Sequence, residues 1–203
     1  MVAVWIETNK GANMSLVETQ SDVANGIDVD VLRKTTEAVA ENRNLGKFTF
    51  EVQGDWAGGV SLESGTGATT QAGVRDASRV NKFTMKSDEP AALLGGDTAV
   101  SPSEYVLQAL AACYTATIAI KAADVGITLR AFHVQVEGDF DLASFLEVAP
   151  EEHPGASQVR VNVDIDAPEA SREQLMELIS VVERRSPIRD TLARPVEVIT
   201  TLL

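Results

Sequence analysis

One long apolar helix constrains this sequence more than any other feature. Ser101, Pro102 and Glu104 have the residue types and spacing of a capping box with proline at the first helical position. The apolar pattern continues to about Asp124, and Gly126 then ends the helix. Its middle is apolar on nearly every side, so we expect the helix to be buried all round. A single small sheet would not provide enough cover for it.

The other segments alternate between strand and helix patterns and predict an α+β fold. We expect a flexible N-terminal arm over residues 1–24 and a single domain over residues 25–203. Period-2 alternation predicts strands at 47–53, 58–62, 79–85, 130–140, 158–165 and 196–203. Helical spacing predicts a helix from Gly26 to about residues 42–44, capped by Asp28 or Asp30, and another after the capping box at 171–174. Residues 64–73 and 87–97 are expected to be loops, and Pro187 is expected to begin a short helical turn.

Composition limits the partners that the chain can bind. Its 17 basic and 30 acidic residues give a formal net charge of -13, which repels nucleic acid and anionic membranes. The longest uncharged apolar run, residues 105–120, is shorter than the roughly 20 residues that cross a bilayer. The N-terminus also lacks the basic flank and apolar length of a signal peptide. We therefore expect a cytoplasmic protein with no nucleic-acid partner and no membrane segment.

The only cysteine, Cys113, lies in the middle of the long helix. One cysteine excludes an intramolecular disulfide and fits a reducing compartment. The thiolate is the reactive form, and a position in mid-helix gives it little help from the helix dipole. Cys113 is therefore either a reactive thiol or a small buried hydrophobe among alanines. His133 and His153 show no metal-ligand spacing, so we expect no metal and no other cofactor.

Several short motifs, taken in order, resemble the OsmC/Ohr hydroperoxide-reductase superfamily over residues 46–203. They are Asp-Glu-Pro at 88–90, Gly-Gly-Asp at 95–97, Ser-Pro-x-Glu at 101–104, Leu-Ala-Ala-Cys at 110–113, Gly-Ile at 126–127 and Ser-Pro-Ile at 186–188. The resemblance implies an intertwined homodimer in which antiparallel sheets from both chains wrap two long central helices. It also implies a peroxidase in which the cysteine of the central helix attacks a hydroperoxide.

The match to the peroxidases of that superfamily is incomplete. Cys113 corresponds to their attacking cysteine, but Ser186 occupies the position of their resolving cysteine. Ser103 replaces their glutamate, and the carboxylate of Glu104 comes one residue later. Glu104 precedes Cys113 by nine residues, or two and a half turns, so the two side chains point to nearly opposite helix faces. We therefore favour the capping box as the role of Glu104, although it stays a catalytic candidate.

The activating arginine of those peroxidases has no clear counterpart. Lys86, Arg79 and Arg75 are candidates, although a residue of this kind is more often a solvated charge at a strand edge than a catalytic one. We expect Leu110, Tyr114 and Phe83 to line a pocket near the helix. Ser186 is a further candidate binding residue, or simply the cap of the helical turn that Pro187 begins.

The resemblance implies a thiol-dependent reductase of organic hydroperoxides that uses one cysteine and an external thiol. The alternative is a catalytically degenerate dimer that binds an apolar small molecule, since the resolving cysteine and the usual glutamate are both replaced. A third reading is an interaction module that uses the extra N-terminal helix.

Overall fold

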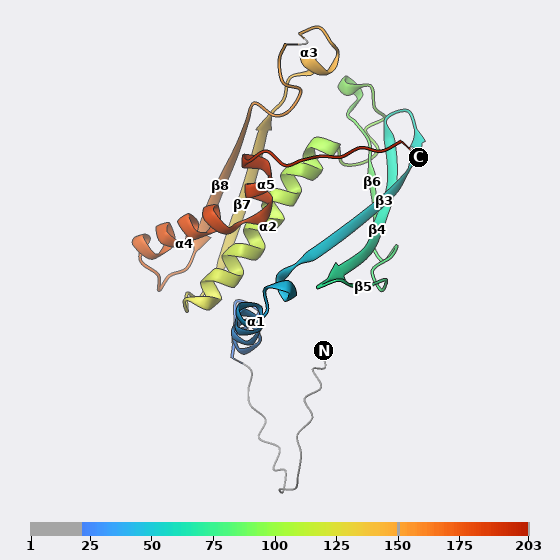
Figure 1. Ribbon diagram of the computed structural model, residues 1–203. Coiled ribbons are helices and arrows are strands. Elements are labelled where there is room, and N and C mark those ends of the chain that lie inside the picture. The colour runs from blue at the N-terminus through green and yellow to red at the C-terminus, as the bar shows by residue number, and fades with distance from the viewer. Residues whose placement is uncertain (1–21, 150, 203) are drawn as a thin grey trace, which may run out of the picture.

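A computed structural model describes residues 22–149 and 151–202, and Figure 1 shows their arrangement. The predicted arm therefore lies mostly outside the described residues. Helices and strands are mixed along the chain, as the α+β prediction requires. The strands are β1 Val23–Ala24, β2 Ile27–Asp28, β3 Phe48–Gly58, β4 Ser61–Gln71, β5 Val74–Asp76, β6 Thr84–Ser87, β7 Ala131–Asp139 and β8 Gln158–Asp166. The α-helices are α1 Val29–Glu41, α2 Pro102–Asp124, α3 Leu142–Phe145, α4 Arg172–Arg185 and α5 Pro187–Ala193, and the 3-10 helices are η1 Arg43–Gly46 and η2 Ala91–Leu93.

The long helix α2 begins and ends as predicted. The Glu104 amide donates to Ser101 Oγ at 3.2 Å, and the Ser101 amide donates to Glu104 Oε2 at 2.8 Å. These two bonds complete the capping box and satisfy amides that have no partner within the helix. Gly126 follows the helix with a positive φ of 73°, a conformation in which a side chain would be strained.

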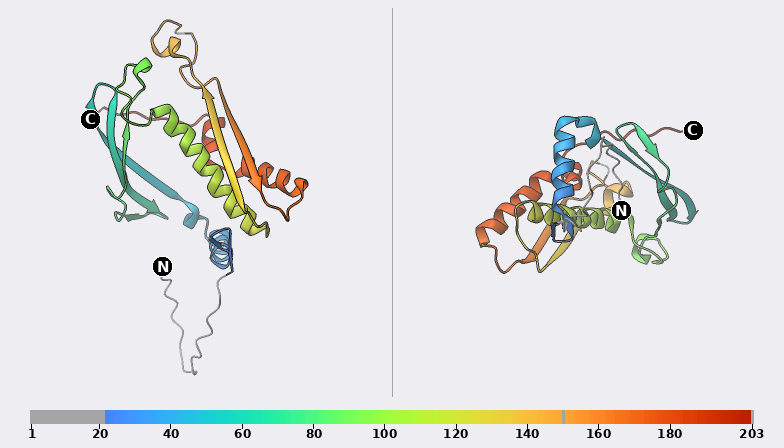
Figure 2. Two further views of the ribbon diagram at one scale, coloured as in Figure 1. Left: turned by 180° about the vertical axis from the view of Figure 1, so that it is seen from behind. Right: turned by 90° about the horizontal axis from the view of Figure 1, so that it is seen from below.

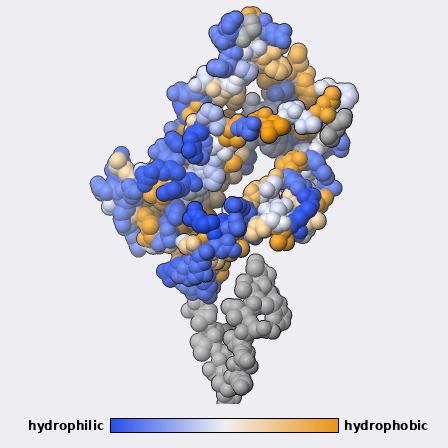
Figure 3. Space-filling model, viewed as in Figure 1, coloured by the Kyte–Doolittle hydropathy of each residue, from blue (hydrophilic) through white to orange (hydrophobic). Residues whose placement is uncertain are grey.

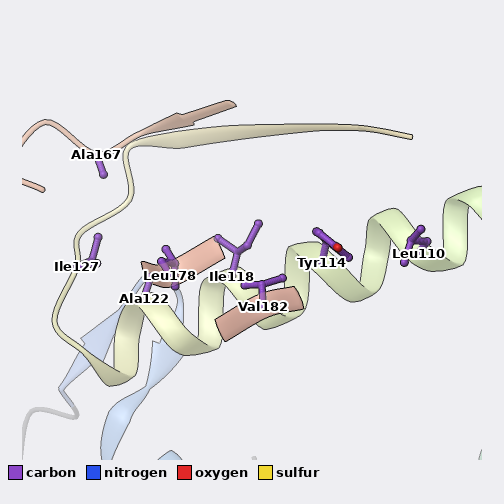
Figure 4. Packing of buried hydrophobic residues seen from close by; sticks show 8 residues of the cluster. All are labelled: Leu110, Tyr114, Ile118, Ala122, Ile127, Ala167, Leu178 and Val182. Carbon is purple, nitrogen blue, oxygen red and sulfur yellow. The ribbon is translucent and has the colours of Figure 1, made fainter. Parts of the chain in front are cut away.

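The core lies on one side of α2. The antiparallel hairpin of β7 and β8 and the helix α4 pack there, as Figures 1 and 4 show. Ile118 on α2 and Val182 on α4 are both fully buried. Eight residues form this buried apolar cluster: Leu110, Tyr114, Ile118, Ala122, Ile127, Ala167, Leu178 and Val182. Alternate residues of β7 pack against it, namely Phe132, Val134 and Val136.

The opposite side of α2 is not covered by the residues that the structure describes. Val106, Ala109, Ala112 and Ala116 are exposed there, so the expectation of a helix buried all round is not met within the described part of one chain. By length and composition alone α2 could cross a membrane. Its buried face, however, forms the core described above, as the central helix of a globular fold does.

A second sheet, of β3, β4, β5 and β6, lies on the uncovered side of α2 (Figure 2). Residues 64–73 were predicted to be a loop, which is wrong, because most of them belong to β4. Gly67 explains the misleading pattern: a Cβ there would lie 2.5 Å from the Cβ of Glu51 on β3. Gly67 is a glycine because β3 and β4 approach each other closely there, and not because the chain turns. The strand predicted at 79–85 is also placed too early, since β6 begins only at Thr84.

The N-terminal end of the described chain is held by side-chain hydrogen bonds. Asp28 caps α1, as one of the two predicted caps, and accepts a hydrogen bond from the Val31 amide. The Asn25 side chain ties the β1–β2 turn to the end of α2, because it donates to the Ile127 carbonyl at 2.8 Å and accepts from the Leu129 amide at 2.9 Å.

The strand predicted at 196–203 is absent from the described part of that segment, residues 196–202. The segment runs toward the second sheet but pairs with none of the described strands, and Ile199 and Leu202 are exposed (Figure 1). Hydrophobic residues accordingly lie on the surface along this segment and over the nearby sheet (Figure 3).

Candidate functional site

The fold brings Cys113 and Ser186 together although 73 positions separate them. The Ser186 hydroxyl donates to Cys113 Sγ at 3.1 Å, and the serine is only 1% exposed. Cys113 itself is half-buried. The single thiol is thus held by one buried hydroxyl.

Ser186 is fixed by its place between two helices. It ends α4, where its amide donates to the Val182 carbonyl at 2.8 Å, and it caps α5, where its Oγ accepts from the Arg189 amide at 3.4 Å. Pro187 occupies the first position of α5, as predicted for a helical turn. The packing of α4 and α5 on α2 therefore sets the distance from this hydroxyl to the thiol.

Leu110 and Tyr114 line a pocket of about 510 Å³ between α2, β8, α4 and α5. Burial raises the pKa of the Tyr114 phenol, and the nearby positive charge of Arg189 opposes that effect. Neither Cys113 nor Phe83 is part of this lining, within the residues that the structure describes. Phe83 lies instead just before β6, on the second sheet.

The acidic and basic candidates are engaged elsewhere. Glu104 closes the capping box, and hydrogen bonding from the Ser101 amide lowers the pKa of its carboxyl. Lys86 pairs with Glu63 across the second sheet at 2.5 Å. The Arg79 guanidinium stacks over the Phe83 ring, 5.2 Å from its centroid, and Arg75 pairs with Glu51. Within the described chain, these cations belong to the second sheet and its turns and not to the surroundings of the thiol.

The loop before α2 is organised by Asp88, which the sequence pattern did not single out as a functional or structural centre. This carboxylate is 2% exposed and accepts from the Thr98 hydroxyl at 2.7 Å and from the amides of Thr98 and Gly96, both at 3.1 Å. These bonds, chiefly that from the Thr98 hydroxyl, lower the pKa of Asp88 to about 2. A Cβ at Gly95 would collide with the Glu89 carbonyl at 1.7 Å, so glycine is required there.

Arg189 is a second residue that sequence reasoning missed. It lies three residues after the Ser186 cap, a spacing that could have drawn attention to it, because the amide at that position donates to the cap. In the described ranges, no group of three or more His, Cys, Asp or Glu side chains is placed to hold a metal ion.

The fold of this chain is similar to those of several solved structures of OsmC-like proteins. The chain resembles an OsmC-like protein from Mycoplasma pneumoniae, with a TM-score of 0.55 and 20% identity over 71% of this chain and 87% of the other. An organic hydroperoxide resistance protein OsmC from Legionella pneumophila gives 0.52 and 16% over 71% and 88%. An OsmC-like protein of unknown function from Vibrio cholerae gives 0.51 and 11% over 70% and 92%. At these identities the likeness shows a shared fold, an α+β fold around one long helix.

The sequence comparison then gives the family. The pattern described as OsmC-like protein matches residues 95–201, which is more than half of the chain. The protein therefore belongs to the OsmC-like family, as the motifs around Cys113 and Ser186 indicated. None of the curated proteins compared with this sequence matches it.

Asp88 should make stability depend on acid pH. Its pKa is lowered from 3.8 to about 2, so its contribution is complete above about pH 5 and is lost as the pH falls through about 2. We expect Asp88→Asn to lower the urea midpoint at neutral pH, and the difference from wild type to shrink on acidification. Urea unfolding at about pH 7, 4 and 3 measures this.

Asp124→Asn is the matched control, because Asp124 is exposed and pairs only with Lys121 in the described chain. Its effect should be small at each pH. A difference between Asp88→Asn and wild type that stays constant down to about pH 3 would contradict the role of the Asp88 carboxylate.

Proposed function

We propose that this protein is a thiol-dependent reductase of organic hydroperoxides that uses Cys113 alone. The contact that carries the proposal is the hydrogen bond of 3.1 Å from the buried Ser186 hydroxyl to Cys113 Sγ. It holds the single sulfur of an OsmC-like chain in place, on a residue that is half-buried and not sealed in the core. The similar structure from Legionella pneumophila, which bears the name organic hydroperoxide resistance protein, adds support at the level of the fold.

The chemistry balances with one cysteine and two external thiols. The Cys113 thiolate attacks the outer oxygen of ROOH, the O–O bond breaks, and the products are Cys113–SOH and RO⁻, which takes up a proton to give the alcohol. An external thiol then forms a mixed disulfide with Cys113 and releases water. A second external thiol attacks that disulfide, restores the Cys113 thiol and leaves as the external disulfide.

Ser186 suits this one-cysteine cycle. Its hydroxyl cannot form a disulfide with oxidised Cys113, so the sulfenic acid has to wait for an external thiol. The same O–H that donates to sulfur in the reduced protein can donate to the sulfenate oxygen without moving a backbone atom.

The surroundings of the thiol favour an organic substrate. Ala109, Ala112 and Ala116 lie one turn or less from Cys113 on the uncovered part of α2 and are all exposed. An alkyl or aryl group of the peroxide would rest on these methyl groups.

We further propose the homodimer that the family resemblance implies. The chain exposes 16011 Å², whereas a compact monomer of 21.7 kDa exposes about 9,200 Å². Residues outside the described ranges, even if fully exposed, would add only about 3,600 Å².

On the second sheet Phe48 and Phe50 stack with centroids 6.0 Å apart and are 52% and 73% exposed. If the α2 helix of the partner lay over this sheet, the exposed face of α2 and the apolar face of the sheet would both be covered. Lys86 or Arg79 of one chain would then lie on the same side as Cys113 of the other chain.

We also propose that the protein is cytoplasmic and that it has no nucleic-acid or membrane partner. Its supports are the net charge of -13 and the single cysteine, which needs a reducing compartment to stay a thiol.

A second candidate function is a dimer that has lost catalysis and binds an apolar small molecule. The observation that favours it is that Lys86 and Arg75 are paired with carboxylates on the second sheet, and not with the thiol. The two functions differ in whether Cys113 reacts with peroxide.

Peroxide should add one oxygen to Cys113 within seconds. We expect intact-mass spectrometry of the reduced protein, after one equivalent of cumene hydroperoxide, to show a single-oxygen adduct that a dithiol removes. Cys113→Ala should show no such adduct. An adduct that forms no faster than on a free thiol would exclude the reductase and favour the ligand-binding dimer.

Ser186→Cys should convert the one-cysteine cycle into one with an internal disulfide. The second sulfur would lie close to Cys113 Sγ, because the serine oxygen is 3.1 Å away, and would attack the sulfenic acid with loss of water. We expect peroxide to yield a protein two mass units lighter than the reduced form, in place of the oxygen adduct. Ser180→Cys is the control and should keep the adduct, because Ser180 is half-buried on α4 and its hydroxyl bonds to Arg184 and not to Cys113. A persistent sulfenic acid in Ser186→Cys would contradict the proposed approach of the two side chains.

The protein should be a dimer of about 43 kDa, twice 21.7 kDa, by light scattering coupled to gel filtration. Phe50→Asp should shift it toward the monomer, since it places a charge on the apolar face. Thr49→Asp lies on the other face of β3 and should leave the dimer intact. A monomeric wild-type protein at micromolar concentration would contradict the proposal.

A further inference from the structure

The pocket beside Tyr114 has the size and walls of a small-molecule site. Its volume of about 510 Å³ lies within the range of such sites, and helices α2, α4 and α5 and strand β8 enclose it. Its apolar lining consists chiefly of Leu110, Val159, Val161, Val163, Ile179 and Leu192. A mainly apolar ligand of modest size would be desolvated there.

One tyrosine side chain brings a hydroxyl to the lining of this pocket. Tyr114 as a residue is 4% exposed, and hydrogen bonding with the Arg189 side chain is one of the causes that lower the pKa of its phenol against the effect of burial. Figure 4 shows the residue on the buried face of α2, in line with Leu110 and Ile118. A phenol oxygen that accepts from Arg189 keeps its own O–H to donate to an acceptor in the pocket.

Arg189 supplies further donors at the same end of the pocket. Its guanidinium uses Nη1 to donate to the Glu183 carbonyl at 3.1 Å and also interacts with the Tyr114 hydroxyl. A guanidinium has five N–H donors, so further donors remain for a ligand in the pocket that Arg189 lines. Arg189 and Glu183 both influence the Tyr114 phenol, which places the hydroxyl at this charged end.

Glu183 decides the charge of the ligand. Its side chain lines the same pocket, so an anionic head group would meet a carboxylate as well as the guanidinium. The net charge of -13 adds a long-range penalty for anions. A neutral carbonyl that also bears an N–H or O–H would accept from Tyr114 and Arg189 and donate to Glu183.

We propose that this pocket binds a small, mainly apolar molecule whose polar end is a neutral carbonyl group, such as a primary amide. The Tyr114 hydroxyl and the Arg189 guanidinium donate to its carbonyl oxygen, and Glu183 accepts from its N–H. The site does not depend on the redox chemistry of Cys113, which is not in the lining among the described residues.

Calorimetric titration of the reduced full-length protein with octanamide, octanoate and octylamine tests this assignment. The three probes share an apolar chain of nearly the same length and differ in the charge of the head group. No peroxide is present, so the result is separate from the outcome for the reductase. We expect octanamide to bind best; no octanamide binding up to its solubility limit, or tighter binding of octanoate, would overturn the proposal.

Tyr114→Phe keeps the ring and removes the hydroxyl, and should weaken octanamide by about 3- to 10-fold, the effect of one lost hydrogen bond. Glu183→Gln should reduce the discrimination against octanoate. Met176→Ala, on the exposed part of α4 outside this lining, is the control and should bind as wild type does. Thermal melting of each variant shows whether it is folded. Equal octanamide affinity in folded Tyr114→Phe and wild type would refute the role of the hydroxyl.

Discussion

The packing of α4 against one face of α2 is the interaction on which the rest of the structure depends. Ile118 and Val182 are fully buried in the cluster where the two helices meet. This contact fixes the end of α4, and therefore the start of α5, relative to the middle of α2. The pocket and the thiol contact both lie along that same junction. A core of ordinary apolar side chains thus sets the geometry of the groups that could do chemistry.

Ser186 shows how a change of one atom type alters the possible chemistry without altering the fold. A hydroxyl at a helix cap holds a sulfur 3.1 Å away and donates a hydrogen bond to it. A sulfur in its place could make a covalent bond instead. A sulfur would be a weaker acceptor than the hydroxyl for the Arg189 amide, so the serine also gives the better cap for α5. The residue at this position thus decides both the quality of the cap and whether oxidised Cys113 needs an outside reductant.

Local signals in the sequence predicted the elements that depend on local rules. The capping boxes at Ser101 and Ser171, the alternation of β7 and β8 and the family motifs around Cys113 were all readable from spacing. The errors arose where neighbours decide the structure: Gly67 permits a close strand, and residues 196–202 pair with no strand in the described part of the chain. The joining of Ser186 to Cys113 came from the family resemblance. The role of Asp88 was missed because its partners are brought together by the folded loop before α2, and that of Arg189 because its partners lie on the other helices α2 and α4.

The attachment of the N-terminal helix carries a consequence of its own. Asn25 holds the β1–β2 turn to the chain after α2 through two hydrogen bonds, and α1 follows that turn. Most of α1 is exposed, with Val29 as its buried residue, so little apolar area ties it to the core. Such a segment can open by itself, as a cooperative unit of low local stability, while α2 stays closed. Its opening would break the contacts of Asn25 and Val29 and would leave the packing of α2 on α4 in place.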